Sequence, residues 1–185
     1  MAMHNVFTGA NGTLIISKED TPEGQDAEAI ANAYAGFGAI ARVTNVEVYV
    51  QTELEEFHEV GRRHPVSLHS GNIRISGKVG QAYVNGALLW LLLGRGASAN
   101  KIAEPYVQPA FNMVLSLDDP AVPGNEARLE LKGVKFQNWG YALPDDDFVM
   151  QNVTLKALAI RVLDKEAPAG GGEATVKAPS FPEAS

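Results

Sequence analysis

Three histidines and two glutamates lie close together in the sequence, and side chains of these types can bind a transition metal. They are His58, His64 and His69, with Glu56 and Glu59. Their spacing matches neither a zinc protease nor a zinc finger, and His64 precedes Pro65 in a predicted turn. We therefore expect these histidines to lie on a solvated surface, and we predict no metal site.

The run Asp145-Asp146-Asp147 could bind a hard cation, because Ca²⁺ and Mg²⁺ prefer oxygen ligands. It lacks the alternating order and the distal glutamate of an EF-hand, and an acidic run after Pro144 is typical of a solvated turn. Gly94-Arg95-Gly96 ends an apolar stretch, so it would close a helix and could not present amides to a phosphate. The sequence predicts no cofactor.

Catalysis by a nucleophile or by paired acids has little support. The chain has no cysteine and no Gly-x-Ser-x-Gly motif, which excludes thiol chemistry and gives no serine nucleophile. Glu55 and Glu59 could form an acid–base pair, but Glu55 lies in an acidic strand with no local reason for a raised pKa. We expect the protein not to be an enzyme.

The stretch 43–83 predicts a long β-hairpin whose first strand has one apolar and one acid-rich face. Side chains alternate between the faces of a strand, so the apolar face carries Val46, Val48, Val50 and Leu54. The other face carries Glu47, Tyr49, Gln51, Glu53 and Glu55. We expect the first face to enter a core and the second to line a wet, negative surface.

The second strand of the hairpin, over about 67–83, divides in the same way. Its apolar face carries Ile73, Ile75, Gly77 and Val79, and its polar face carries Asn72, Arg74, Ser76 and Lys78. Pairing of the two strands would place Arg74 and Lys78 near the acidic row. The polar face is then mixed in charge, with acid in excess along the first strand.

The remaining pattern predicts a mainly β domain over 1–166, followed by a flexible Pro/Gly/Ala-rich tail over 167–185. The first strand of the hairpin is expected over about 41–57, and further strands are expected at 13–17, 110–117, 128–141 and 148–163. Residues 18–38 form a loop excursion with a short helix that Asp26 would cap and that would run to Tyr34. Residues 85–93 predict a second helix, apolar nearly all round and ended by Gly94, which must be buried on more than one side.

Composition limits the classes of partner. The 185-residue chain has a formal net charge of −7, which argues against a general nucleic-acid binder. Its most apolar run, 87–93, is far too short to cross a bilayer, so we expect no membrane span. Residues 1–13 lack the basic and apolar segments of a secretion signal, so cytoplasmic synthesis is expected.

Several stretches, taken in order, resemble a bacteriophage tail tube protein. They are the hairpin 46–60, the sequence Glu59-Val60-Gly61-Arg62-Arg63, residues 73–79, the helix 87–93, residues 133–136 and residues 144–158. The last stretch joins an acidic turn to a strand that ends in Lys-Ala-Leu, a recurring closing element of the family. The resemblance covers about residues 40–163.

The resemblance implies an antiparallel β-sandwich or barrel with one packed helix, whose long hairpin joins a β-barrel formed between subunits. Six copies would form a ring, and rings would stack into a hollow virion tail tube for DNA, assembled in the host cytoplasm. Lumen-lining candidates are then Glu47, Tyr49, Gln51, Glu53, Glu55, Asn72, Arg74, Ser76 and Lys78. Candidates for contacts between rings or subunits are Arg62, Arg63, Asp118 and Asp119.

The implied partners are further copies of the chain, a tape measure protein and DNA in the lumen, a baseplate and a tail terminator. A sheath would lie outside if the tail is contractile, which the closing strand favours. Three other functions stay open: a secreted tube ring like the hemolysin-coregulated family, an isolated β-sandwich module that binds a basic ligand, and a small enzyme at the hairpin base.

Overall fold

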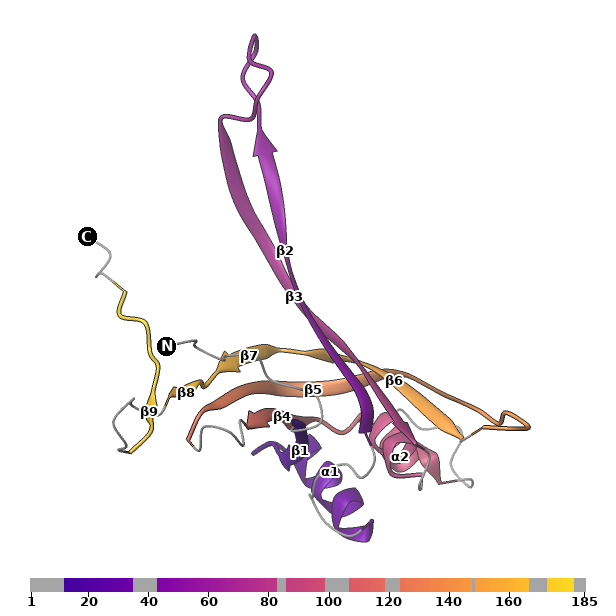
Figure 1. Cartoon of the computed structure of the whole chain (residues 1–185). Coiled ribbons are helices and arrows are strands. Elements are labelled where there is room, and N and C mark those ends of the chain that lie inside the picture. Colours follow the sequence, from indigo (N-terminus) through magenta and orange to yellow (C-terminus); the bar gives the residue numbers. More distant parts are fainter. Residues whose placement is uncertain are drawn as a thin grey trace.

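The computed structural model describes residues 12–34, 43–82, 86–98, 107–118, 124–147, 149–166 and 173–181. The chain forms one curled antiparallel sheet with helices against one side, and a long hairpin rises from the other side (Figure 1). The elements in chain order are β1 Gly12–Lys18, α1 Pro22–Ala33, β2 Val43–Phe57, β3 Ser67–Ala82, α2 Ala87–Leu93, the 3-10 turn η2 Gly94–Ala97, β4 Phe111–Asp118, β5 Glu126–Ala142, β6 Met150–Ala157, β7 Ala159–Val162, β8 Lys165–Glu166 and β9 Thr175–Val176. The predicted mainly β fold with a packed helix and a long hairpin is confirmed.

The sheet has two halves that share strand β5. The main strand order is β1-β4-β5-β6-β3-β2, and every pairing is antiparallel. The first part of β5 pairs with β4 and β7, and its second part pairs with β6. The half made of β5, β6, β3 and β2 carries the hairpin.

Strand β5 bends where it passes from one half to the other. Gly133 lies at the bend with φ of 61°, a left-handed conformation that favours glycine. A Cβ at this position would meet Leu158 Cδ1 at 2.6 Å, so the Leu158 side chain lies directly over the glycine. The sequence predicts one strand over 148–163, but the structure divides it into β6 and β7 at Leu158, opposite this bend.

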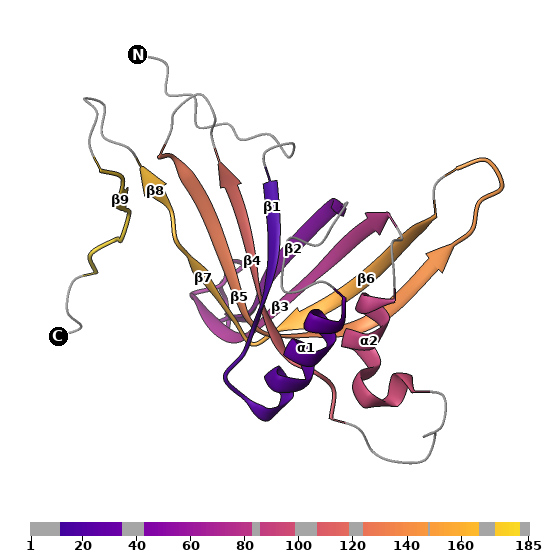
Figure 2. The ribbon, with the colours of Figure 1, turned by 90° about the horizontal axis from the view of Figure 1, so that it is seen from below.

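The core lies between the sheet and the two helices, which pack side by side against it (Figure 2). Its largest members are fully buried side chains of the strands: Phe111, Met113, Leu131, Val134, Leu155 and Val79. Phe111 and Phe136 meet edge to face with ring centroids 4.9 Å apart. Helix α2 adds Leu88 and Leu91 to this core, in agreement with the predicted buried helix.

Helix α1 begins earlier than predicted. The expected cap, Asp26, is wrong: Thr21 is the N-cap, and its Oγ1 accepts a hydrogen bond from the Gly24 amide at 3.1 Å. Pro22 fills the first turn, where a missing amide costs nothing. Asp26 instead accepts two hydrogen bonds from Arg95, at 3.1 and 2.8 Å, and so ties α1 to η2.

The C-terminal tail is partly ordered into a strand. Within the described residues 173–181, Thr175 and Val176 form β9, which pairs with β8. The expectation that 167–185 holds no regular structure is therefore wrong at these two residues, while the flexibility of the tail stays a prediction. In β8, Lys165 also contacts Glu126 of β5 at 3.1 Å.

Replacing Gly133 by Ala tests the bend. We expect a loss of about 1–3 kcal/mol in the free energy of unfolding, because the residue would hold a strained backbone conformation and press on Leu158. Gly140→Ala, on the same strand with no heavy atom within 4 Å of the new Cβ, should change it by less than about 0.5 kcal/mol. Equal urea midpoints for the two variants would contradict the account of the bend.

Candidate functional site

The outer half of the β2–β3 hairpin projects clear of the sheet (Figure 1). Strand β3 pairs with β6 only from Ile75 to Ala82, so beyond Ile75 the two hairpin strands have only each other. An irregularity in pairing between Thr52 and Leu54 adds a local bend. Strand spacing gives this arm a length of about 20–25 Å before its tip.

One face of the hairpin is polar, as the alternation predicts. Strand pairing places Glu47 opposite Lys78, Tyr49 opposite Ser76 and Gln51 opposite Arg74. Partners directly opposite each other share a face, so the predicted polar residues of the two strands form one surface. Asn152 and Thr154 of β6 and Asn138 of β5 continue this face across the four-stranded half.

Charges on the polar face are mixed. Tyr49 and Asn45 donate hydrogen bonds to the Glu47 carboxylate, the second at 2.9 Å, and lower its pKa below the ordinary value, with a further contribution from Lys78. Arg74 forms an ion pair with Glu53. The acid-rich row expected from β2 is thus offset by cations of β3.

The opposite face of the hairpin is mainly apolar but is buried only at its base, and Thr52, Ser70 and Glu56 interrupt it farther out. Val46 and Val48 pack against the core, and Ile75 is 8% exposed. Farther out, Val50, Leu54, Leu68 and Ile73 are 52%, 60%, 59% and 65% exposed. Exposed apolar side chains that gather on one face of an arm are typical of a surface that contacts another molecule.

Two strand edges of the four-stranded half are open. In the described part of the chain, β2 pairs only with β3, and β5 from Lys135 onward pairs only with β6. Open edges with unpaired backbone groups are templates for pairing with another chain. The Gln108 side chain donates one hydrogen bond to the Phe136 carbonyl, at the start of the β5 edge.

The other predicted residues are scattered. Arg62 and Arg63 lie in the exposed hairpin tip, where Arg62 contacts Glu59 at 3.5 Å, and Asp118 ends β4. Asp119 lies outside the described residues. No group of three or more residues that could hold a metal occurs in the described ranges, and His58 simply contacts Glu56 at 3.2 Å. No helix among those residues is long and apolar enough to cross a membrane.

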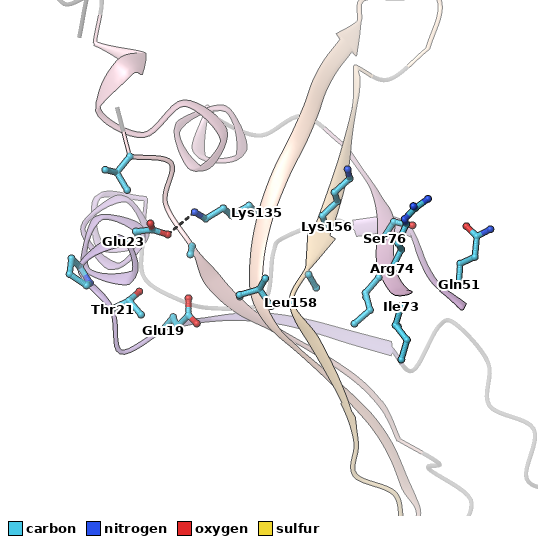
Figure 3. Close-up of a pocket in the computed structure, with 16 residues that line it drawn as sticks. Glu19, Thr21, Glu23, Gln51, Ile73, Arg74, Ser76, Lys135, Lys156 and Leu158 are labelled. Atoms are coloured by element: carbon cyan, nitrogen blue, oxygen red, sulfur yellow. Dashed lines mark ion pairs between the residues drawn. The ribbon is translucent and has the colours of Figure 1, made fainter. Parts of the chain in front are cut away.

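A groove of about 1000 Å³ lies where the hairpin leaves the sheet (Figure 3). Its apolar lining includes Ile73, Ala157 and Leu158, and lysines from β5 and β6 stand beside them. The sequence analysis named three of the lining residues, Gln51, Arg74 and Ser76, as lumen candidates, but it missed the groove because the walls come from α1, β2, β3, β5 and β6. One sequence signal could have indicated the groove: a charged residue is followed directly by two apolar residues at the end of a strand, in Lys156-Ala157-Leu158.

Neither a family model nor a curated protein matches the sequence. Solved structures do match in fold. A chain in the 6-fold symmetrised baseplate of the anti-feeding prophage superposes with a TM-score of 0.58 at 14% identity, covering 88% of this chain and 97% of that one. A chain of the sheath–tube complex of an extracellular contractile injection system (PVC) gives 0.53 at 11% identity, covering 86% and 93%.

The SPP1 tail tube protein gives a TM-score of 0.52 at 11% identity, covering 85% of this chain and 78% of that one. These matches agree with the open-edged sheet and the projecting hairpin described above. The chain therefore has the tail tube fold. Its neighbours in fold space are structural tube and injection-system proteins.

Polar substitutions on the exposed apolar face should separate folding from assembly. We expect Leu54→Ser with Leu68→Ser to change the stability of the unassembled chain by less than about 0.5 kcal/mol per site, because both side chains are more than half exposed. Ile75→Ala, at the buried base of the same face, should cost about 2–5 kcal/mol.

Denaturant unfolding of dilute protein measures the first effect, and light scattering at high concentration measures assembly. The double serine variant should lose concentration-dependent association while it keeps its unfolding midpoint. Association at the wild-type concentration would mean that the apolar face is not an interface.

Proposed function

We propose that the protein is the structural subunit of a tail tube, which assembles into six-membered rings that stack into a hollow conduit for DNA ejection. The observation that carries this proposal is the four-stranded half-sheet with both edges open, one polar face and a projecting apolar arm. In the described part of a single chain the edges have no pairing partner, the polar face encloses no channel, and the apolar arm is uncovered. Addition of further copies completes all of them together.

The geometry of the edges favours a closed ring. The edges of β2 and β5 lie on opposite sides of the four-stranded half, so pairing β2 of one copy with β5 of the next is a head-to-tail contact. Contacts of this kind close into rings when the rotation per subunit divides a full turn. The resulting barrel would have no free edges, which removes the hazard of stray pairing. The 6-fold symmetry named for the anti-feeding prophage baseplate supports six copies.

The polar face would then line the lumen. It is the side of the half-sheet opposite the core. The pairs Glu47–Lys78, Tyr49–Ser76 and Gln51–Arg74 share this side, and the remaining lumen candidates, Glu53, Glu55 and Asn72, follow on the arm. The glutamates of this face repel phosphate, and Arg74, one of its cations, is paired with Glu53, which suits a surface past which DNA must slide. A tape measure protein would occupy the lumen before DNA, a baseplate and terminator would close the ends, and a sheath would surround a contractile tail in the virion.

A second candidate is the tube of a contractile injection system that carries protein. It is favoured by the mixed charge of the polar face, where Arg74 and Lys78 offset the glutamates, because a wall of both signs accepts proteins of varied charge. The match to the PVC sheath–tube complex agrees with this candidate. Both candidates share the same ring and tube.

Assembly state is the decisive measurement for the shared proposal. We expect negative-stain microscopy of the purified protein over a concentration series to reveal six-fold rings or hollow tubes, and solution mass to rise in steps of six subunits. A protein that stays monomeric at every concentration, also in the presence of preformed tube ends, would contradict the proposal.

Charge on the lumen wall distinguishes the two candidates. In particles that carry variant tubes, replacing Glu47, Glu53 and Glu55 by Gln should slow DNA release, and replacing them by Lys should slow it further, because phosphates would bind the wall. Rings should form in both variants, since these side chains face away from the core. Equal rates of DNA release for wild type, Gln and Lys tubes would reject the lumen assignment for DNA.

A further inference from the structure

The groove at the base of the hairpin has an apolar floor with cations around it. Leu158 is 83% exposed, and it lies between the hairpin residue Ile73 on one side and α1 on the other (Figure 3). Ile73 is itself 65% exposed. A large side chain this open beside other apolar groups is a docking surface and not part of the core.

The cations of the groove are not all neutralised within the chain. Lys135 and Lys156 lie directly opposite each other on β5 and β6, where two like charges disfavour the pairing. Glu23 of α1 relieves one of them by an ion pair with Lys135 at 2.7 Å. Lys156 is exposed and has no ion pair in the described part of the chain, so the groove keeps an unmatched positive charge.

The complementary surface lies on the turn between β5 and β6. Residues 143–147 form an exposed loop that carries Leu143, which is 73% exposed, followed by Pro144 and three aspartates. Among the described residues, Asp145 and Asp146 form no ion pair. An exposed leucine next to a run of carboxylates is the counterpart of an apolar floor next to a free lysine.

Loop and groove are too far apart to meet within one copy. The loop adjoins Met150 at the start of β6, whereas Ala157 and Leu158 at its end line the groove. Eight strand residues separate these ends by about 25 Å, and the two views place the turn at the far end of the sheet. Any contact between them joins two copies, head to tail along the strand direction.

We propose that the acidic loop 143–147 of one copy docks in the groove of a second copy in the adjacent ring. This inference rests on the proposed ring assembly: the loop and the groove lie at opposite ends of the strands that would form the barrel, so each ring presents loops at one rim and grooves at the other. Leu143 meets the apolar floor, and Asp145 and Asp146 face Lys156. The contact fixes one direction of stacking.

Cysteine cross-linking tests the contact directly, because the native chain has no cysteine. We expect a chain with both Asp146→Cys and Lys156→Cys to form, on mild oxidation of assembled tubes, disulfide ladders that extend beyond two subunits. Each single variant can form at most dimers and is the matched control. Tubes that yield no ladder above the dimer would overturn the proposal.

Charge reversal gives a second readout that does not depend on oxidation. Asp145→Lys with Asp146→Lys should leave rings intact but reduce tube length at least tenfold, and so should Lys156→Glu; combining all three should restore stacking. Lys132→Glu, an exposed lysine on β5 outside the groove, is the control. Full-length tubes from both the loop variant and the Lys156→Glu variant would overturn the docking and favour the exposed hairpin face as the contact between rings. A wild-type protein that forms no rings would instead overturn the proposed function itself.

Discussion

Backbone pairing along β5 is the constraint on which the rest of the structure depends. In the described chain this one strand pairs with β4 and β7 in its first part and with β6 in its second part. The bend at Gly133 turns the sheet at the changeover, with Leu158 packed over the glycine. Because of this turn the second half of β5 has an edge that β4 does not cover, and the hairpin half of the sheet keeps an open edge there.

A single chain buries the apolar side chains of its core but leaves those of the hairpin arm exposed. Phe111, Met113 and their neighbours are fully buried between sheet and helices, so the body has an ordinary hydrophobic core. The arm has none: its apolar face is covered at the base and open beyond Ile75. A single strand pair without a covered face is marginally stable in water, so the arm depends on whatever packs on it for its own rigidity.

The parts of the fold that follow from local pattern could be predicted from the sequence. The two faces of β2 depend only on strand alternation, and the end of α2 at Gly94 depends on one residue with φ of 57°. Features set by distant residues could not be predicted. The break at Leu158 lies opposite the bend at Gly133, and the groove gathers side chains from five elements. The cap of α1 is a local signal that the prediction misassigned: Thr21 and Pro22 start the helix four residues before Asp26, which pairs with Arg95. The charge balance of the polar face could be predicted only in part. Strand alternation places Arg74 on the polar face, but it does not show that Arg74 pairs with Glu53.

The long separation between β1 and β4 sets the order in which the nascent chain can fold. Gly12 pairs with Leu117, so β1 has no partner until β4 has been synthesised, whereas β2 and β3 are neighbours in sequence and can pair at once. At about 5–20 residues per second, the ribosome leaves β1 unpartnered for roughly 5–20 s. The arm is therefore complete before the body, and β5 and β6, which carry both the second edge and the groove, come last. In the proposed tube, translation would itself delay polymerisation, because a chain still on the ribosome lacks the β5 edge with which β2 of another copy would pair.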